Sequence, residues 1–211
     1  MTSVLIVDDH PIVLQGCRRV LQDRGMAPIF EARDVETGQQ LARAHQPDVI
    51  IIDLAMQGSG LGGLSLIRTI RASNPRARIL VFSMHSDPII VSRALQAGAT
   101  GYLLKDTSSE DLVRAVERVA AGTPYLSPDL AAQVALVDAG AVRNPLADLT
   151  PRELQTLGLL AQGKPYGHIA VELNISYKTV VNLCYQLRQK LEVHTLPELI
   201  RLSVQLVPNG S

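Results

Sequence analysis

The sequence predicts an α/β fold, with a doubly wound, five-stranded parallel sheet followed by a second, smaller all-α domain. Two observations carry this prediction. From residue 1 to about residue 122, short apolar runs alternate with stretches of helical periodicity, which is the pattern of a parallel sheet covered on both faces. From residue 148 to residue 211 only helical periodicity appears, and residues 123–147 between them carry the turn-forming prolines of a linker.

The strands expected in residues 1–122 are short runs rich in β-branched and other apolar residues. They are Val4–Val7, Pro28–Glu31, Val49–Asp53, Ile79–Phe82 and Gly101–Leu104. An amphipathic helix follows each strand, so right-handed crossovers are expected throughout. These helices are Ile12–Arg24, Val35–His45, Leu64–Ala72, Ile89–Ala97 and Ser109–Ala121.

The rest of the chain is expected to be helical. The linker holds one short apolar stretch, Leu130–Val137, which predicts a helix of its own. Thr150, Pro151 and Glu153 then form a capping box at a helix start, and Gly163 ends that helix. Two of the following helices are joined by about three residues, which predicts a helix-turn-helix. The expected helices are His168–Leu173, Tyr177–Leu191 and Pro197–Val207.

Composition excludes several classes of protein. The chain has 20 basic and 20 acidic residues, so any surface for nucleic acid must be local rather than a property of the whole chain. We see no signal peptide and no apolar run near the ~18 residues that a membrane span needs. Cys17 and Cys184 are too few and too distant to indicate a disulfide framework. We therefore expect a cytoplasmic protein with no membrane partner.

Functional side chains of a parallel sheet gather beyond the carboxyl ends of its strands. In the flavodoxin-like strand order 2-1-3-4-5, the first, third, fourth and fifth strands are neighbours. Three carboxylates meeting at one edge repel each other, and a hard divalent cation such as Mg²⁺ offsets that repulsion. A phosphoryl group on Asp53 would then be held by the metal, a hydroxyl and an ammonium. The side chains expected to converge are Asp8, Asp9, Asp53, Ser83 and Lys105.

Because of these residues, the segment 1–122 resembles the receiver domain of a bacterial two-component response regulator. The resemblance implies that Asp53 accepts a phosphoryl group from a partner histidine kinase. It also implies that Asp9, Asp53 and the backbone carbonyl of Ala55 hold Mg²⁺, with Asp8 acting through water. Such a domain is a phosphoryl acceptor and switch, and it is not classed as an enzyme.

The same resemblance assigns a switch pair, Ser83 and Tyr102, which repacks toward the phosphoryl group. Lys105 would bind that group. His85, two residues after Ser83, either lines the pocket and tunes dephosphorylation or is a solvated loop histidine.

Residues 148–211 resemble the LuxR-type helix-turn-helix of the NarL/FixJ group, which implies a transcription regulator that dimerises on activation and binds promoter DNA. The recognition helix would be Tyr177–Lys190, with its N-terminal part in the major groove. Family lysines are missing at Val181 and Tyr185; Asn182 either reads adenine or is a solvated polar residue. The expected DNA contacts are Lys178, Thr179, Val181, Asn182, Tyr185, Arg188 and Lys190.

Two other functions remain open at this point. The loop after Asp53 departs from the family pattern, with Gln57 in place of the usual proline, which leaves room for a DNA-binding regulator controlled by a ligand or partner protein instead of phosphorylation. In addition, Gly58–Gly63 reads G-x-G-x-x-G, the nominal fingerprint of a nucleotide-cofactor enzyme. That motif follows the third strand rather than the first and lacks the acidic residue ~20 positions on. We therefore favour the phosphoacceptor interpretation over a nucleotide-cofactor enzyme.

Overall fold

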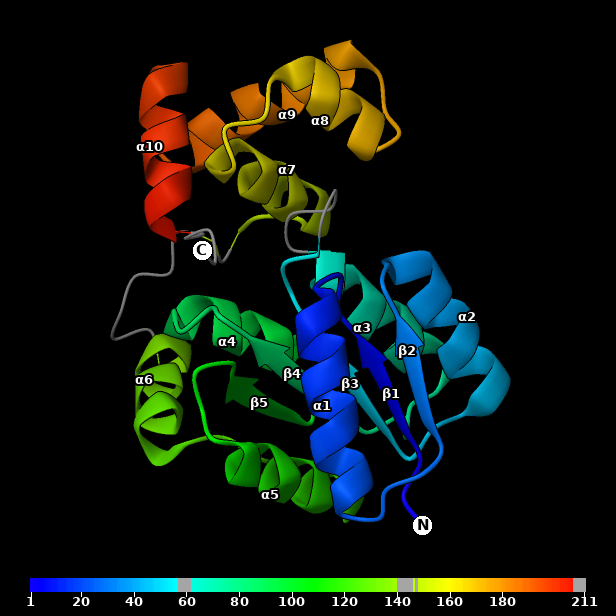
Figure 1. Ribbon diagram of the computed structural model, residues 1–211. Helices are drawn as coiled ribbons and strands as arrows, with labels where there is room; N and C mark the ends of the chain where they lie inside the picture. The colour runs from blue at the N-terminus through cyan, green and yellow to red at the C-terminus, as the bar shows by residue number, and fades with distance from the viewer. Residues whose placement is uncertain (57–61, 140–145, 147, 207–211) are drawn as a thin grey trace.

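The N-terminal part of the protein is a five-stranded parallel sheet in the order β2-β1-β3-β4-β5 (Figure 1). The computed structural model describes residues 1–56, 62–139, 146 and 148–206. Every neighbouring pair of strands is parallel, as the sequence predicted. The strands are β1 (Val4–Val7), β2 (Ile29–Ala32), β3 (Val49–Ile52), β4 (Ile79–Ser83) and β5 (Gly101–Leu104).

Helices cover both faces of this sheet. The first and fifth pack on one face, around a core that includes Val4, Ile6 and Leu103. The second, third and fourth pack on the other, around Leu5, Val7 and further apolar residues. The five are α1 (Pro11–Asp23), α2 (Val35–His45), α3 (Gly62–Ser73), α4 (Pro88–Gln96) and α5 (Ser109–Ala120). Parallel strands buried on both faces explain why β1 and β3 are continuous apolar runs rather than alternating ones.

Within the part of the chain that the structure describes, five further helices follow. α6 (Pro128–Asp138) forms in the linker and lies beside α4 (Figure 1). The C-terminal helical domain packs α7 against both α9 and α10, and α8 against α9. Its helices are α7 (Pro151–Ala161), α8 (Tyr166–Glu172), α9 (Tyr177–Lys190) and α10 (Leu196–Leu206).

Both local signals predicted for α7 are present, and α9 has an N-cap that was not predicted. The Thr150 side chain accepts from the backbone of Glu153, and the Glu153 carboxylate accepts from the Thr150 N–H at 2.7 Å, which completes the capping box. Gly163 adopts a φ of 72°, a left-handed conformation that ends α7 without strain. Ser176 caps α9 by accepting from the Thr179 N–H at 3.1 Å.

Apolar packing runs without a break from the sheet into the C-terminal domain. Val134 and Val137 of α6, Leu149 before α7 and Leu157 within it belong to the same core cluster as the face of the sheet that carries α2, α3 and α4. No helix in the described residues is long and apolar enough to cross a membrane.

Candidate functional site: a carboxylate pocket and an exposed helix

Three carboxylates meet at the carboxyl edge of the sheet. Asp8 and Asp9 follow β1, and Asp53 follows β3. Because the two strands are paired in register from Val4 to Val7, these carboxylates come out side by side. One ligand atom from each, together with one from His10, lies within 4.8 Å of the others. Asp8 and Asp53 are 2% and 3% exposed, so their charges are largely shielded from water. The convergence expected from the sequence is therefore present.

Lys105 bridges the two most buried carboxylates. Its Nζ lies 2.7 Å from Asp8 Oδ2 and 2.9 Å from Asp53 Oδ2. Burial raises the pKa of Asp53, Lys105 lowers it, and the charge of Asp8 raises it again, with a net increase. Burial alone would lower the pKa of Lys105, but Asp53 and Asp8 hold it above its usual value. The lysine thus stays protonated and offsets part of the repulsion among the acids.

The pocket retains capacity for a cation. Asp53 Oδ1 is buried and has no hydrogen-bond donor among the described residues. His10 Nδ1 lies 3.1 Å from Asp8 Oδ1 and 2.8 Å from Asp9 Oδ1, on the outer side of the cluster. Several carboxylate oxygens around one point are the ligands that Mg²⁺ prefers, and a buried acceptor without a donor is costly unless a cation or proton reaches it. The residues present therefore fit Mg²⁺.

The two expected switch residues and His85 meet on one side of the pocket. Ser83 ends β4 and is fully buried, and Tyr102 of β5 is 1% exposed. The Tyr102 hydroxyl donates to the backbone carbonyl of His85 at 2.7 Å, which ties β5 to the segment between β4 and α4. The His85 ring is buried, and burial and the charge of Lys105 lower its pKa. Of the two alternatives for His85, the solvated loop histidine is wrong.

Gly63 determines how closely α3 approaches the pocket. A Cβ atom on it would lie 2.3 Å from the backbone oxygen of Asp53 and 2.7 Å from Leu54 Cα. Its own N–H donates to the Leu54 carbonyl at 3.2 Å. The last glycine of the G-x-G-x-x-G motif is thus explained by contact with the strand end that carries Asp53. Residues 57–61, which hold most of that motif, lie outside the described residues.

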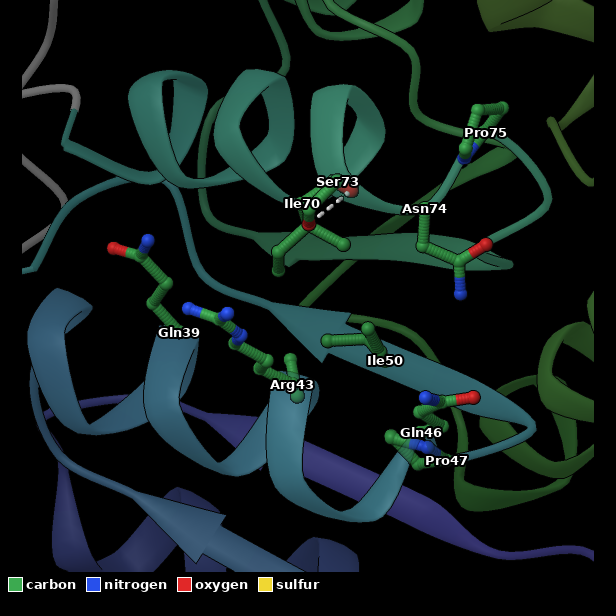
Figure 2. A pocket seen from close by; sticks show the side chains of 10 residues that line it. Gln39, Arg43, Gln46, Pro47, Ile50, Ile70, Ser73, Asn74 and Pro75 are labelled. Atoms are coloured by element: carbon green, nitrogen blue, oxygen red, sulfur yellow. Dashed lines mark hydrogen bonds between the residues drawn. The ribbon is translucent and has the colours of Figure 1, made fainter.

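A second cavity, of about 630 Å³, lies at the opposite end of the sheet (Figure 2). It is lined by the C-terminal ends of α2 and α3 and by Ile50 near the start of β3. Gln39, Arg43 and Asn74 supply its polar wall (Figure 2). Since the carboxylates follow the other ends of the strands, this cavity takes no part in their chemistry.

One face of α9 carries the side chains expected to contact DNA. Tyr177, Val181 and Tyr185 are 59%, 40% and 56% exposed, unusual values for large apolar side chains. Their spacing of four residues puts them on one stripe of the helix. The expected contacts Lys178, Thr179 and Asn182 are exposed as well.

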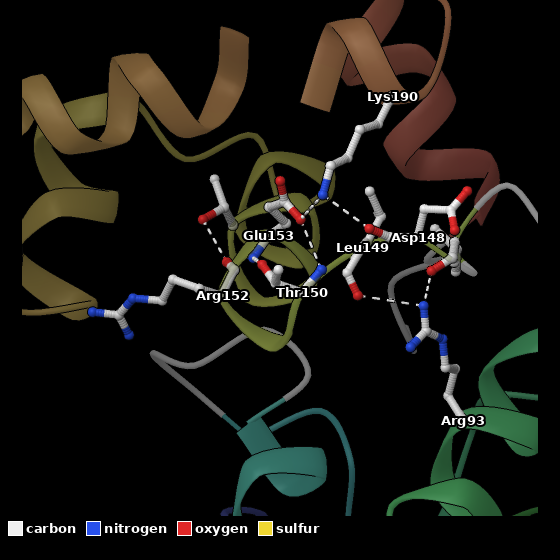
Figure 3. A network of polar contacts seen from close by, with 9 residues as sticks. Arg93, Asp148, Leu149, Thr150, Arg152, Glu153 and Lys190 are labelled. Carbon is white, nitrogen blue, oxygen red and sulfur yellow. Dashed lines mark hydrogen bonds and ion pairs between the residues drawn. The ribbon is translucent and has the colours of Figure 1, made fainter. Parts of the chain in front are cut away.

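The last two expected DNA contacts are engaged elsewhere in the domain. Lys190 Nζ lies 2.8 Å from Glu153 Oε2 and donates to the carbonyl of Asp148 at 2.9 Å (Figure 3). Burial alone would raise the pKa of Glu153, but Lys190 and the Thr150 cap hold it below its usual value. Arg188 donates to the His194 carbonyl at 3.1 Å, and its guanidinium lies over the Tyr185 ring. The geometry gives both cations structural partners within the domain.

Sequence reasoning missed three residues of interest. His10 joins the acidic cluster, and its position directly after Asp8 and Asp9 was an available signal. The contact of Gly63 with the strand end had only the glycine run as a signal. Arg93 of α4 donates to the carbonyls of Leu146 and Leu149, a contact between distant segments that no sequence pattern announces (Figure 3).

A sheet that gathers three acids, a lysine and a hydroxyl at one edge, followed by a helix-turn-helix whose second helix is exposed, is typical of proteins that join a receiver to a DNA-binding domain. Comparison with known families agrees. Residues 4–117 match the response regulator receiver domain, and residues 147–203 match the luxR family of bacterial regulatory proteins. The chain belongs to the two-component response regulators of the NarL/FixJ type, with a LuxR-type DNA-binding domain.

Individual relatives resemble the chain over both domains. The response regulator UvrY of Escherichia coli O157:H7 is 35% identical over 97% of this chain and 94% of its own length. The nitrate/nitrite response regulator protein NarL of Escherichia coli K12 is 39% identical over 84% and 83%. The structure of RcsB from Salmonella enterica serovar Typhimurium, bound to promoter P1flhDC in the presence of the phosphomimetic BeF3-, superposes with a TM-score of 0.71 at 29% identity. It covers 97% of this chain and 98% of the RcsB chain.

Proposed function

We propose that Asp53 is the phosphoacceptor and that its phosphorylation by a partner histidine kinase controls the binding of a dimer of this chain to promoter DNA. The observation that carries this proposal is the position of the Asp53 carboxylate. One of its oxygens is paired with Lys105 at 2.9 Å, and the other is buried without a donor among the described residues. A carboxylate held in this way has a free nucleophilic oxygen.

The transfer follows from these groups. Asp53 Oδ1 attacks the phosphorus of a phosphohistidine, the oxygen–phosphorus bond forms, and the phosphorus–nitrogen bond breaks as the imidazole leaves. Lys105 Nζ turns from the carboxylates toward the new phosphoryl oxygens, and the Ser83 hydroxyl donates to one of them. Asp9, Asp53 and the Ala55 carbonyl would hold Mg²⁺, with Asp8 acting through water. An ion bound there would neutralise part of the charge on the phosphoryl oxygens.

A labelling experiment tests this assignment. The full chain is incubated with acetyl phosphate and Mg²⁺, and the acyl phosphate is located by mass spectrometry of peptides. Asp53→Asn removes the nucleophilic oxygen and is expected to abolish labelling. The exposed Asp23 on α1 provides a matched control, and Asp23→Asn is expected to label like the wild type. Undiminished labelling of Asp53→Asn would refute the assignment.

For DNA, we propose that α9 enters the major groove with its exposed stripe toward the bases. Val181 would contact a thymine methyl group, and Asn182 would bond to adenine through its amide. Lys178 and Thr179 would contact phosphates. Arg188 and Lys190 would contribute by holding the helix in place, since each is bonded within the domain. The superposition on promoter-bound RcsB supports an arrangement of the two domains that leaves α9 accessible.

We further propose the domain limits and the cellular setting. Residues 1–122 would form the receiver, 123–147 the linker and 148–211 the DNA-binding domain, which acts in the cytoplasm. These limits are supported by the end of α5 at Ala120 and the start of α7 at Pro151. The main alternative is a regulator that binds DNA independently of phosphorylation, and comparing DNA affinity with and without a phosphodonor separates the two.

A further inference from the structure

The linker helix α6 is bonded to α4 at its C-terminal end. Leu130, Val134 and Val137 of α6 are each 6% exposed and belong to the same apolar core as α4. The Ser92 hydroxyl of α4 donates to Asp138 Oδ1 at 2.6 Å. A carboxylate in the last turn of a helix is disfavoured by the helix dipole, so this bond offsets an unfavourable position of Asp138.

The next residue of α4 holds the far end of the linker. The Arg93 guanidinium donates to the carbonyl of Leu146 and, at 3.3 Å, to that of Leu149 (Figure 3). Leu149 directly precedes Thr150, the N-cap of α7. Consecutive residues of α4 therefore hold the C-terminal end of α6 and the segment at the start of the DNA-binding domain.

The same helix is joined to the phosphorylation pocket. Only four residues separate Ser83, the end of β4, from Pro88, the start of α4. Tyr102 fixes that segment through the His85 carbonyl at 2.7 Å. A shift of Ser83 toward a phosphoryl group on Asp53 would therefore act on the N-terminal end of α4. On the α3 side, Gln155 of α7 donates to the Ser65 hydroxyl at 3.2 Å, a second contact between the domains.

We propose that α4 is a clamp, with Ser92 and Arg93 as positioning residues, that holds the DNA-binding domain in a DNA-competent orientation and that phosphorylation of Asp53 tightens. This inference rests on the proposed function. The stripe of Tyr177, Val181 and Tyr185 remains exposed while the clamp is closed, so the receiver does not cover the face of α9 that is proposed to meet DNA. A held orientation favours a dimer whose two recognition helices must reach half-sites at fixed spacing, since less freedom is lost on binding.

Two substitutions each remove the contacts that one of the two positioning residues makes with the linker. Arg93→Ala removes both carbonyl contacts, and Ser92→Ala removes the hydroxyl donor to Asp138 at 2.6 Å while leaving the longer bond from Gln96 Nε2 at 3.4 Å. Arg93→Lys keeps the charge but replaces the planar fork with one ammonium, so it is expected to restore binding in part. The exposed Arg114 on α5, which pairs only with the half-buried Asp111 among the described residues, provides the control variant Arg114→Ala.

The test measures labelling and DNA affinity separately on the full chain. Each variant is labelled with acetyl phosphate and Mg²⁺, and its affinity is then measured for a duplex obtained by binding-site selection with the labelled wild type. We expect normal labelling of Asp53 in all variants. The affinity of the labelled Arg93→Ala protein should fall about tenfold, as expected for loss of a charged hydrogen-bond pair, with a smaller fall for Ser92→Ala and none for Arg114→Ala.

Small-angle X-ray scattering of the same samples supplies a readout independent of DNA. An open clamp is expected to increase the radius of gyration of labelled Arg93→Ala relative to labelled wild type. Should Arg93→Ala fail to fold, Ser92→Ala and Arg93→Lys carry the test. Wild-type affinity and scattering in these variants would overturn the clamp while leaving the proposed function intact, and tighter DNA binding would show that the contact is inhibitory. An unlabelled wild type would instead refute the proposed function.

Discussion

Replacement of Lys105 by methionine tests the electrostatic balance of the pocket. The change removes the ammonium 2.7 Å from Asp8 Oδ2 and 2.9 Å from Asp53 Oδ2, and both acids are nearly inaccessible to water. Removing one partner from a buried ionic cluster costs about 3–5 kcal/mol, because the remaining charges lose their compensation. Protonation of one carboxylate limits that cost, so we expect a loss of about 3 kcal/mol at neutral pH without divalent cations.

Scanning calorimetry measures this loss as a fall in the melting temperature of the receiver, on the order of 10 °C in EDTA for a domain of this size. Mg²⁺ is expected to restore most of it, because a site saturated at about 100 times its Kd contributes about 2.7 kcal/mol. Mg²⁺ should also stabilise the variant more than the wild type, whose lysine competes with the ion. The exposed Lys178 provides a control, Lys178→Met. The reasoning is refuted if Lys105→Met melts like the wild type in EDTA, or if Mg²⁺ raises both melting temperatures equally.

Four further predictions address separate parts of the chain. Gly63→Ala forces α3 away from the Asp53 backbone and should cost about 2 kcal/mol in urea unfolding, slowing labelling as well; an unchanged midpoint would contradict the contact. Glu153→Gln should lower the free energy of unfolding by about 1–2 kcal/mol at neutral pH, less than for a fully buried ion pair because the partner Lys190 is partly exposed. Because the pKa of Glu153 is lowered in the folded protein, this deficit should shrink as the pH falls below about 4, and a deficit independent of pH would exclude the ion pair. Burial raises the pKa of the Cys17 thiol to about 12, so a thiol reagent at pH 8 should modify it only after unfolding, and rapid reaction of the native protein would contradict its burial. Lys178→Ala should lower the log–log salt slope of DNA binding by about 0.9 per subunit, and an unchanged slope would remove this lysine from the phosphate contacts.

Much of the fold could be predicted because its signals are local. β1 and β5 begin and end where the apolar runs do, and the other strands differ by one residue at one end or both. The capping box of α7 is present because its chemistry needs only residues three positions apart. α3 begins at Gly62, two residues earlier than predicted, and Gly63 in its first turn packs closely on the backbone of Asp53 and Leu54 just after β3, which propensity alone does not reveal.

The carboxylate pocket was predictable for a topological reason, whereas the contacts of individual cations were not. Asp8, Asp53 and Lys105 each follow a strand, and parallel strands bring their carboxyl ends to one edge whatever the side-chain detail. Lys190 was expected to face DNA, yet its ammonium pairs with Glu153, 37 residues earlier in the chain. Long, flexible side chains choose partners from the tertiary structure, so the pattern of α9 does not fix where its C-terminal cations point.

The dependence of DNA affinity on a phosphodonor tests the central claim most directly. The full wild-type chain and Asp53→Asn are titrated with the selected duplex at one salt concentration, each with and without acetyl phosphate and Mg²⁺. The account predicts that the phosphodonor increases the affinity of the wild type and leaves that of Asp53→Asn unchanged. Superimposable wild-type curves with and without the phosphodonor, in a sample shown to be labelled, would contradict it.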